Sequence, residues 1–224
     1  MRMSSALTRA IGVACVVVIA ASCGAAVGSG SASTPEPASG APSSPAVSAG
    51  PPAVLWPAPP DPSERAIEAG LELDREEFTI NHAHSHLDVF IDGQEILVPA
   101  GIGIAIDDPE VKYFADVRSY GGIQMCEEPC ISPLHTHDET GVLHTESKDS
   151  EPHSLGQFFT EWGVELSETC VGEHCAPTPI EVYIDGEPFD GDPATIALTD
   201  QKVIVIVVGT PPAEIPSTFD FSNA

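Results

Sequence analysis

Two segments of the chain repeat one pattern, in which apolar and polar residues alternate around an Asp-Gly pair. They are LDVFIDGQEILVP, from Leu87 to Pro99, and IEVYIDGEPFDGDP, from Ile180 to Pro193. Alternation is typical of half-buried strands, and Asp-Gly favours a two-residue hairpin turn. The sequence therefore predicts two β-hairpins. Their likeness suggests duplication of a hairpin unit, but Asp-Gly hairpins recur widely, so common ancestry does not follow.

Further alternating or apolar runs extend this pattern through most of the chain. The expected fold class is α+β: a β-dominated single domain of hairpins with one or two short helices, spanning residues 63–224. The run after Gly209 is expected to form an extended cover. The other expected strands are 79–91, 113–115, 123–125, 134–137, 142–146, 196–198 and 203–208, and the helices are 63–73 and 155–162.

The first sixty residues have a different composition. Residues 1–22 carry two arginines followed by an apolar run, and the run closes on small residues before Cys23, as in a lipoprotein signal peptide. Cleavage before Cys23 and lipidation of its thiol would anchor the protein to the membrane, outside the cytoplasm on the cell envelope. The alternatives are an ordinary secretory signal and an uncleaved membrane anchor. Residues 23–62, rich in Pro, Ser, Ala and Gly, are expected to form a disordered, flexible tether.

The charge balance excludes some classes of partner. The chain has 34 acidic and 8 basic residues, a formal net charge of −26. Binding to phosphates depends on clusters of Lys and Arg, so nucleic acid is not an expected partner. The chain also lacks a phosphate-binding glycine loop and a dinucleotide fingerprint, which argues against nucleotide binding, and it lacks the GxSxG motif of serine hydrolases.

Four cysteines lie in the expected domain, in the motifs CEEPC and CVGEHC. Outside the cytoplasm, cysteines generally form disulfides, and four allow three connectivities. The simplest expectation pairs Cys126 with Cys130 and Cys170 with Cys175. The alternative is that Cys126 and Cys130 are soft metal ligands.

Six of the eight histidines fall in two short segments, NHAHSHLDV and LHTHDETGVLHTE. In the first segment, the period of two places His82, His84 and His86 on one face of a strand. In the second, a turn centred on residues 139–140 pairs His135 with His144 and His137 with Val142. Cross-strand Cβ atoms lie about 5 Å apart, so the imidazoles of His135, His137 and His144 should form a triangle about one ion wide.

Neutral imidazoles bind Zn²⁺ and Cu, and three of them leave a coordination position open. Glu146 lies on the same face as His144, as a fourth ligand, an orienting partner or a general base. The first histidine segment would either complete this site or make a second one. The opposing interpretation is a solvated strand face or hydrogen-bonded core histidines, but six imidazoles fill a core poorly because each ring nitrogen needs a partner.

The motifs, in their order, also carry a resemblance. Between residues 81 and 209 the chain contains, in this order, the motifs HxHxHLxVFIDG, VPAGIGI, PLHTHDETGVLHTES, LGQFFTEWG and VYIDGEPF. This order resembles a family of exported bacterial and archaeal proteins with an HTHD and GVxHxES signature. The family has no assigned activity, so the resemblance implies motif boundaries but no reaction.

Three functions are compatible with these features. The leading expectation is a lipid-anchored, extracytoplasmic protein that binds Zn or Cu for capture, buffering or delivery, with a metal donor or acceptor protein as its partner. The second is a metal-dependent enzyme with a three-histidine site and Glu146 as acid or base. The third is an envelope interaction module whose histidines sense acid.

Overall fold

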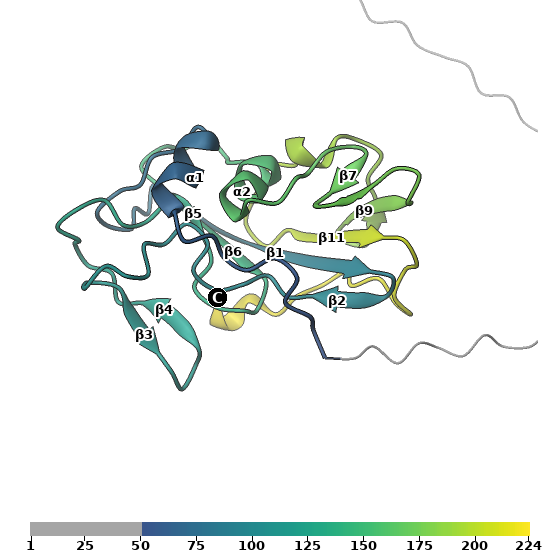
Figure 1. Cartoon of the computed structure of the whole chain (residues 1–224). Helices are drawn as coiled ribbons and strands as arrows, with labels where there is room; N and C mark the ends of the chain where they lie inside the picture. The colour runs from purple at the N-terminus through teal and green to yellow at the C-terminus, as the bar shows by residue number, and fades with distance from the viewer. Residues whose placement is uncertain (1–50) are drawn as a thin grey trace, which may run out of the picture. The chain divides into compact units, whose positions relative to one another are not determined.

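The computed structural model of the chain describes residues 51–224. These residues belong to one compact unit. The expected signal peptide, Cys23 and most of the tether lie outside the described residues. The described residues form two α-helices, α1 (Pro62–Glu68) and α2 (Leu155–Trp162), and two short 3₁₀ helices, η1 (Pro193–Thr195) and η2 (Phe221–Asn223) (Figure 1). The strands are β1 Asn81–Ile91, β2 Gln94–Ile96, β3 Lys112–Phe114, β4 Ser119–Gly121, β5 Leu134–His135, β6 Val142–Ser147, β7 Cys170–Val171, β8 His174–Cys175, β9 Ile180–Ile184, β10 Glu187–Pro188 and β11 Val203–Val208.

The main sheet has the strand order β10-β9-β11-β1-β6-β5, with β2 paired to β1. Strands β1 and β11 are parallel, and the other neighbours in this sheet are antiparallel. Both predicted Asp-Gly hairpins are present, as β1–β2 and β9–β10, with positive φ angles at Asp92, Gly93, Asp185 and Gly186. This strand-dominated architecture with two short α-helices confirms the predicted fold class.

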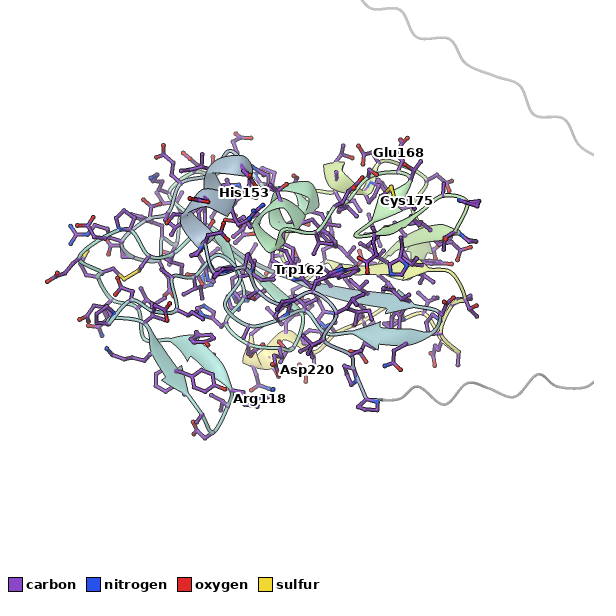
Figure 2. All side chains as sticks on the ribbon, in the orientation of Figure 1. Arg118, His153, Trp162, Glu168, Cys175 and Asp220 are labelled. Atoms are coloured by element: carbon purple, nitrogen blue, oxygen red, sulfur yellow. A yellow bond between two sulfur atoms is a disulfide. The ribbon has the colours of Figure 1, made fainter. Side chains whose placement is uncertain are left out.

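Strand β11 is apolar throughout because both faces of the sheet are covered. Ile204, Ile206 and Val208 belong to the larger core, whereas Val203 and Val205 belong to a core on the opposite face. Helix α2 buries its aromatic residues in the larger core, and the tail after Gly209 covers the other face, as predicted, through residues that include Phe219 and Phe221. In Figure 2, Trp162 of α2 and Asp220 of the tail lie on opposite sides of the sheet.

The two helices begin and end at recognisable residues. Helix α2 has the predicted bounds: Ser154 and Gln157 form a capping box at its start, and Gly163 adopts the left-handed conformation at its end. Helix α1 is shorter than the predicted 63–73 because the chain turns at Gly70, which has a φ of +73°. Within residues 51–224, no helix combines the length and apolar character needed to cross a membrane.

Packing on the domain begins before the predicted domain start at residue 63. Ala53 forms a parallel bridge with Ile96 of β2. The Trp56 ring packs edge-on against Trp162, with centroids 5.7 Å apart, and the Trp162 indole N–H donates to the Trp56 carbonyl at 2.9 Å. The last part of the predicted tether, as far as the structure describes it, therefore lies against the core.

Two predicted strands are wrong. Residues 123–125 are irregular, and the partner of β3 is instead β4 at 119–121, because the chain reverses earlier, around Arg118 with its positive φ. Residues 196–198 make only a single bridge, between Ala197 and Ser154, because this segment runs beside the start of α2 rather than along the sheet.

Both local cysteine pairs are disulfides, as predicted: Cys126–Cys130 and Cys170–Cys175.

Candidate metal centre

The register of three neighbouring strands gathers the histidines into rows. His84 of β1 lies opposite His144 of β6, which in turn lies opposite His135 of β5. One step along the sheet, His82 of β1 faces Glu146 of β6. The predicted pairing of His135 with His144 is therefore confirmed, and it brings imidazoles from three strands onto one face of the sheet.

His137 reaches the cluster by a different route. Strand β5 ends at His135, so His137 is not part of the ladder with Val142. Strand β4 holds it instead: Tyr120 N–H donates to the His137 carbonyl at 2.8 Å, and His137 Nδ1 donates to the Tyr120 carbonyl at 2.8 Å. An ion pair between Arg118 and Glu139 also joins this hairpin to the turn after His137.

Backbone carbonyls fix the tautomers of two imidazoles. His135 Nδ1 lies 2.9 Å from the Ser132 carbonyl, and His137 Nδ1 contacts the Tyr120 carbonyl. A carbonyl only accepts, so both Nδ1 atoms carry the proton and both Nε2 atoms present lone pairs. These Nε2 atoms face one another at 3.1 Å, where two acceptors form no hydrogen bond. A tetrahedral ion bound at 2.0 to 2.1 Å would separate its nitrogen ligands by about 3.3 Å, close to this distance.

His144 and Glu146 complete this inner group. His144 lies with its ring centroid 4.5 Å from that of His137 and 5.3 Å from that of His135. Its Nδ1 is buried without a hydrogen-bond partner and lies 3.6 Å from Glu146 Oε1. Candidate ligand atoms of His135, His137, His144 and Glu146 all lie within 4.8 Å of one another. This buried cluster of three imidazoles and one carboxylate has the composition of a transition-metal site.

The protonation states suit a cation. Burial, reinforced by the neighbouring imidazoles, holds the pKa of His135 well below its usual value and lowers the pKa of His137 to about 4. Both rings are therefore neutral near pH 7. Burial acts to raise the pKa of Glu146, but His144 and the other nearby imidazoles outweigh it and lower this pKa, so the carboxylate is ionised. Metal ligation requires these neutral imidazoles and this anionic carboxylate.

His82 and His84 form an outer group with the same Glu146. Their Nε2 atoms lie 3.2 Å apart, and His82 Nε2 lies 3.4 Å from Glu146 Oε1. Candidate ligand atoms of these three residues also lie within 4.8 Å of one another. Burial, followed by the influence of His144, lowers the pKa of His84.

His86 shares the strand face but lies outside both groups. Its partner on β6 is Val142, which offers no ligand atom. Its ring stacks on Phe219 of the tail at a centroid distance of 3.8 Å, and its Nε2 lies 2.9 Å from the Thr140 carbonyl. The structure thus gives His86 a packing role against the tail.

A cavity of about 570 Å³ opens beside the inner group. His137 and His144 line it together with aromatic residues of the β3–β4 hairpin and of the tail, among them Phe114, Tyr120 and Phe219. Glu77 also lines it, with Oε1 3.8 Å from His137 Nε2. Burial, with a contribution from Glu146, raises the pKa of Glu77 to about 7.

Sequence reasoning did not identify Glu77, nor the two carbonyls that fix the tautomers. Glu77 precedes β1 in a stretch with no motif, and it reaches the site only because β1 runs beside β6. Carbonyls of Ser132 and Tyr120 carry no side-chain signal in a sequence.

Comparison of the chain with protein-family models, curated proteins and solved structures found no match.

Proposed function

We propose that this protein binds a transition metal ion, Zn²⁺ or copper, through His135, His137, His144 and Glu146, and that it captures, buffers or delivers this ion outside the cytoplasm. The observation that carries the proposal is the pair of Nε2 lone pairs facing one another at 3.1 Å. Two such lone pairs repel unless a cation lies between them. The excess of acidic residues would also raise the local concentration of cations.

Membrane attachment through a lipid on Cys23 belongs to the same proposal. It is supported by the residues around Cys23, which resemble a lipoprotein cleavage site. Replacing Cys23 with Ser should move the protein from the membrane fraction to the soluble fraction and remove the mass of the lipid. Unchanged membrane association and unchanged mass would reject this part of the proposal and leave metal binding untouched.

The metal proposal is tested on purified protein stripped with a chelator and titrated with Zn²⁺, Cu²⁺ and Cu⁺. The double variant His135→Ala, His137→Ala should bind its preferred ion at least about 100-fold more weakly, because loss of supporting groups alone costs 10- to 100-fold. His174→Ala is the control, since His174 pairs with Glu173 and lies outside both histidine groups. Equal affinity in the wild type and the double variant would refute metal binding at this site.

A metal-dependent enzyme is the second candidate, favoured by the cavity that His137 and His144 line. In such an enzyme Glu146 would be a ligand, and Glu77, which faces both the cavity and His137, would be placed to transfer a proton. Azide added to the Co²⁺-loaded protein separates the two candidates. A change in the visible spectrum indicates a coordination position open to the cavity and favours the enzyme, whereas an unchanged spectrum favours carriage.

A further inference from the structure

The outer group has the elements of a metal site of its own. The Nε2 atoms of His82 and His84 lie 3.2 Å apart, a separation close to the 3.1 Å between those of His135 and His137. Glu146 supplies the carboxylate of this group, and candidate ligand atoms of the three residues lie within 4.8 Å of one another. Two imidazoles and a carboxylate, with water completing the shell, are a common set of ligands for a divalent transition metal ion.

One ion cannot use all of these ligands. Nitrogen and oxygen ligands lie about 2.0 to 2.2 Å from such an ion, so ligand atoms on opposite sides of it are at most about 4.4 Å apart. Candidate ligand atoms of the inner group, and likewise those of the outer group, lie within 4.8 Å of one another, slightly above this limit, and only Glu146 belongs to both groups. The five imidazoles therefore divide between two centres.

Glu146 lies where a bridging carboxylate would lie. Its Oε1 is 3.4 Å from His82 Nε2 of the outer group and 3.6 Å from His144 Nδ1 of the inner group. A carboxylate offers two oxygens and about four lone pairs, enough for two ions. In two-metal sites the ions lie about 3.5 to 4 Å apart.

We infer that the protein holds a dinuclear transition-metal centre, in which Glu146 bridges an inner ion bound by His135, His137 and His144 and an outer ion bound by His82 and His84. This inference rests on the proposed function. The two positions differ in access to solvent: the His82 side chain is 45% exposed, whereas those of His144 and Glu146 are 12% and 10% exposed. The outer ion is therefore the one that exchanges with solution, and the inner ion is retained.

The stoichiometry of Zn²⁺ binding tests the inference on purified full-length protein. The wild type and the control His174→Ala should bind two ions per chain, the second at least about 10-fold more weakly because it has fewer buried ligands. The double variant His82→Ala, His84→Ala should bind one ion with the affinity of the tighter step. The single variant His82→Ala, at an exposed position, should also lose the weaker step, and it serves if the double variant does not fold by circular dichroism.

Cu²⁺ loading provides a second readout. Two Cu²⁺ ions at this separation should give a magnetically coupled electron paramagnetic resonance spectrum, and the His82→Ala variant should give the spectrum of an isolated ion. One ion in both the wild type and the His82→Ala variant would overturn the dinuclear centre while the proposed function stands. Two uncoupled ions would overturn the bridge, and no bound ion in the wild type would overturn the proposed function itself.

Discussion

Glu161 of helix α2 is a buried acid outside the metal centre. Its side chain is fully buried, and neither carboxyl oxygen has a hydrogen-bond partner. Burial raises its pKa to about 8, and the nearby Ser132 side chain, which acts in the opposite direction, does not outweigh burial. At neutral pH this carboxyl is therefore largely protonated in the folded protein, whereas in the unfolded chain it ionises near its ordinary pKa of 4.5.

The direction of the effect on stability follows from proton binding. Between pH 4.5 and pH 8 the folded state holds one proton more than the unfolded state at this position, so the free energy of unfolding falls by about 1.4 kcal/mol per pH unit. The contribution of the Glu161 carboxyl to the free energy of unfolding is complete below pH 4.5 and is lost as pH rises to the folded-state pKa of about 8. Between pH 5.5 and pH 8.5 the expected loss is on the order of 3 kcal/mol.

Replacement of Glu161 with Gln isolates this contribution because the amide stays neutral and has a similar shape. Urea unfolding of the chelator-treated wild type and of Glu161→Gln should be measured at pH 5.5 and pH 8.5. The variant should gain on the order of 3 kcal/mol relative to wild type over this interval, since all other titrations cancel in the difference. The control is Glu165→Gln, an exposed position with no expected gain. A difference between wild type and Glu161→Gln that does not change with pH would refute the reasoning.

Two further predictions concern stability. Gly103 has a φ of +71°, and a Cβ there would lie 2.2 Å from the Leu134 carbonyl oxygen, so Gly103→Ala should lower the free energy of unfolding by more than about 2 kcal/mol. Gly70 is the control, because it has a similar φ of +73° but open space around the Cβ position. Gly70→Ala should lower the free energy of unfolding by about 1 kcal/mol. Equal losses in urea unfolding would contradict the steric argument. Removal of the Cys126–Cys130 disulfide by a double Ala substitution should cost about 2 kcal/mol through the entropy of a short loop, and an unchanged urea midpoint would exclude this role.

The sequence was most informative where its signals were local. The Asp-Gly turns, the helix at 155–162 and the pairing of His135 with His144 all depend on residues close together in the chain. The parallel pairing of β1 with β11 joins His86 to Val203, far apart in the sequence, and alternation alone does not identify such a partner. The predicted strand at 123–125 is wrong because a short alternating segment, Ile-Gln-Met, does not specify where a hairpin turns.

In the candidate site, too, the features that depend on neighbouring residues in the chain were predicted, and those that depend on distant segments were not. The period of two correctly placed His82, His84 and His86 on one face, but only the register with β6 separates His86, opposite Val142, from the two histidines that face potential ligands. The contribution of Glu77 depends on the path of the chain before β1, which has no local pattern.

The edges of the main sheet limit how other chains approach it. Strand β5 has only two residues. A preceding loop covers its outer side, where Ser132 N–H donates to the Gly103 carbonyl and Thr136 N–H donates to the Ile102 carbonyl. Strand β2 is bridged by Ala53, and β10 contains Pro188, which has no N–H to donate. None of these edges offers a long row of unpaired backbone groups, so neither edge-to-edge aggregation nor addition of a foreign strand is favoured. If the proposed metal exchange involves a partner protein, that protein is not expected to add a strand to the main sheet.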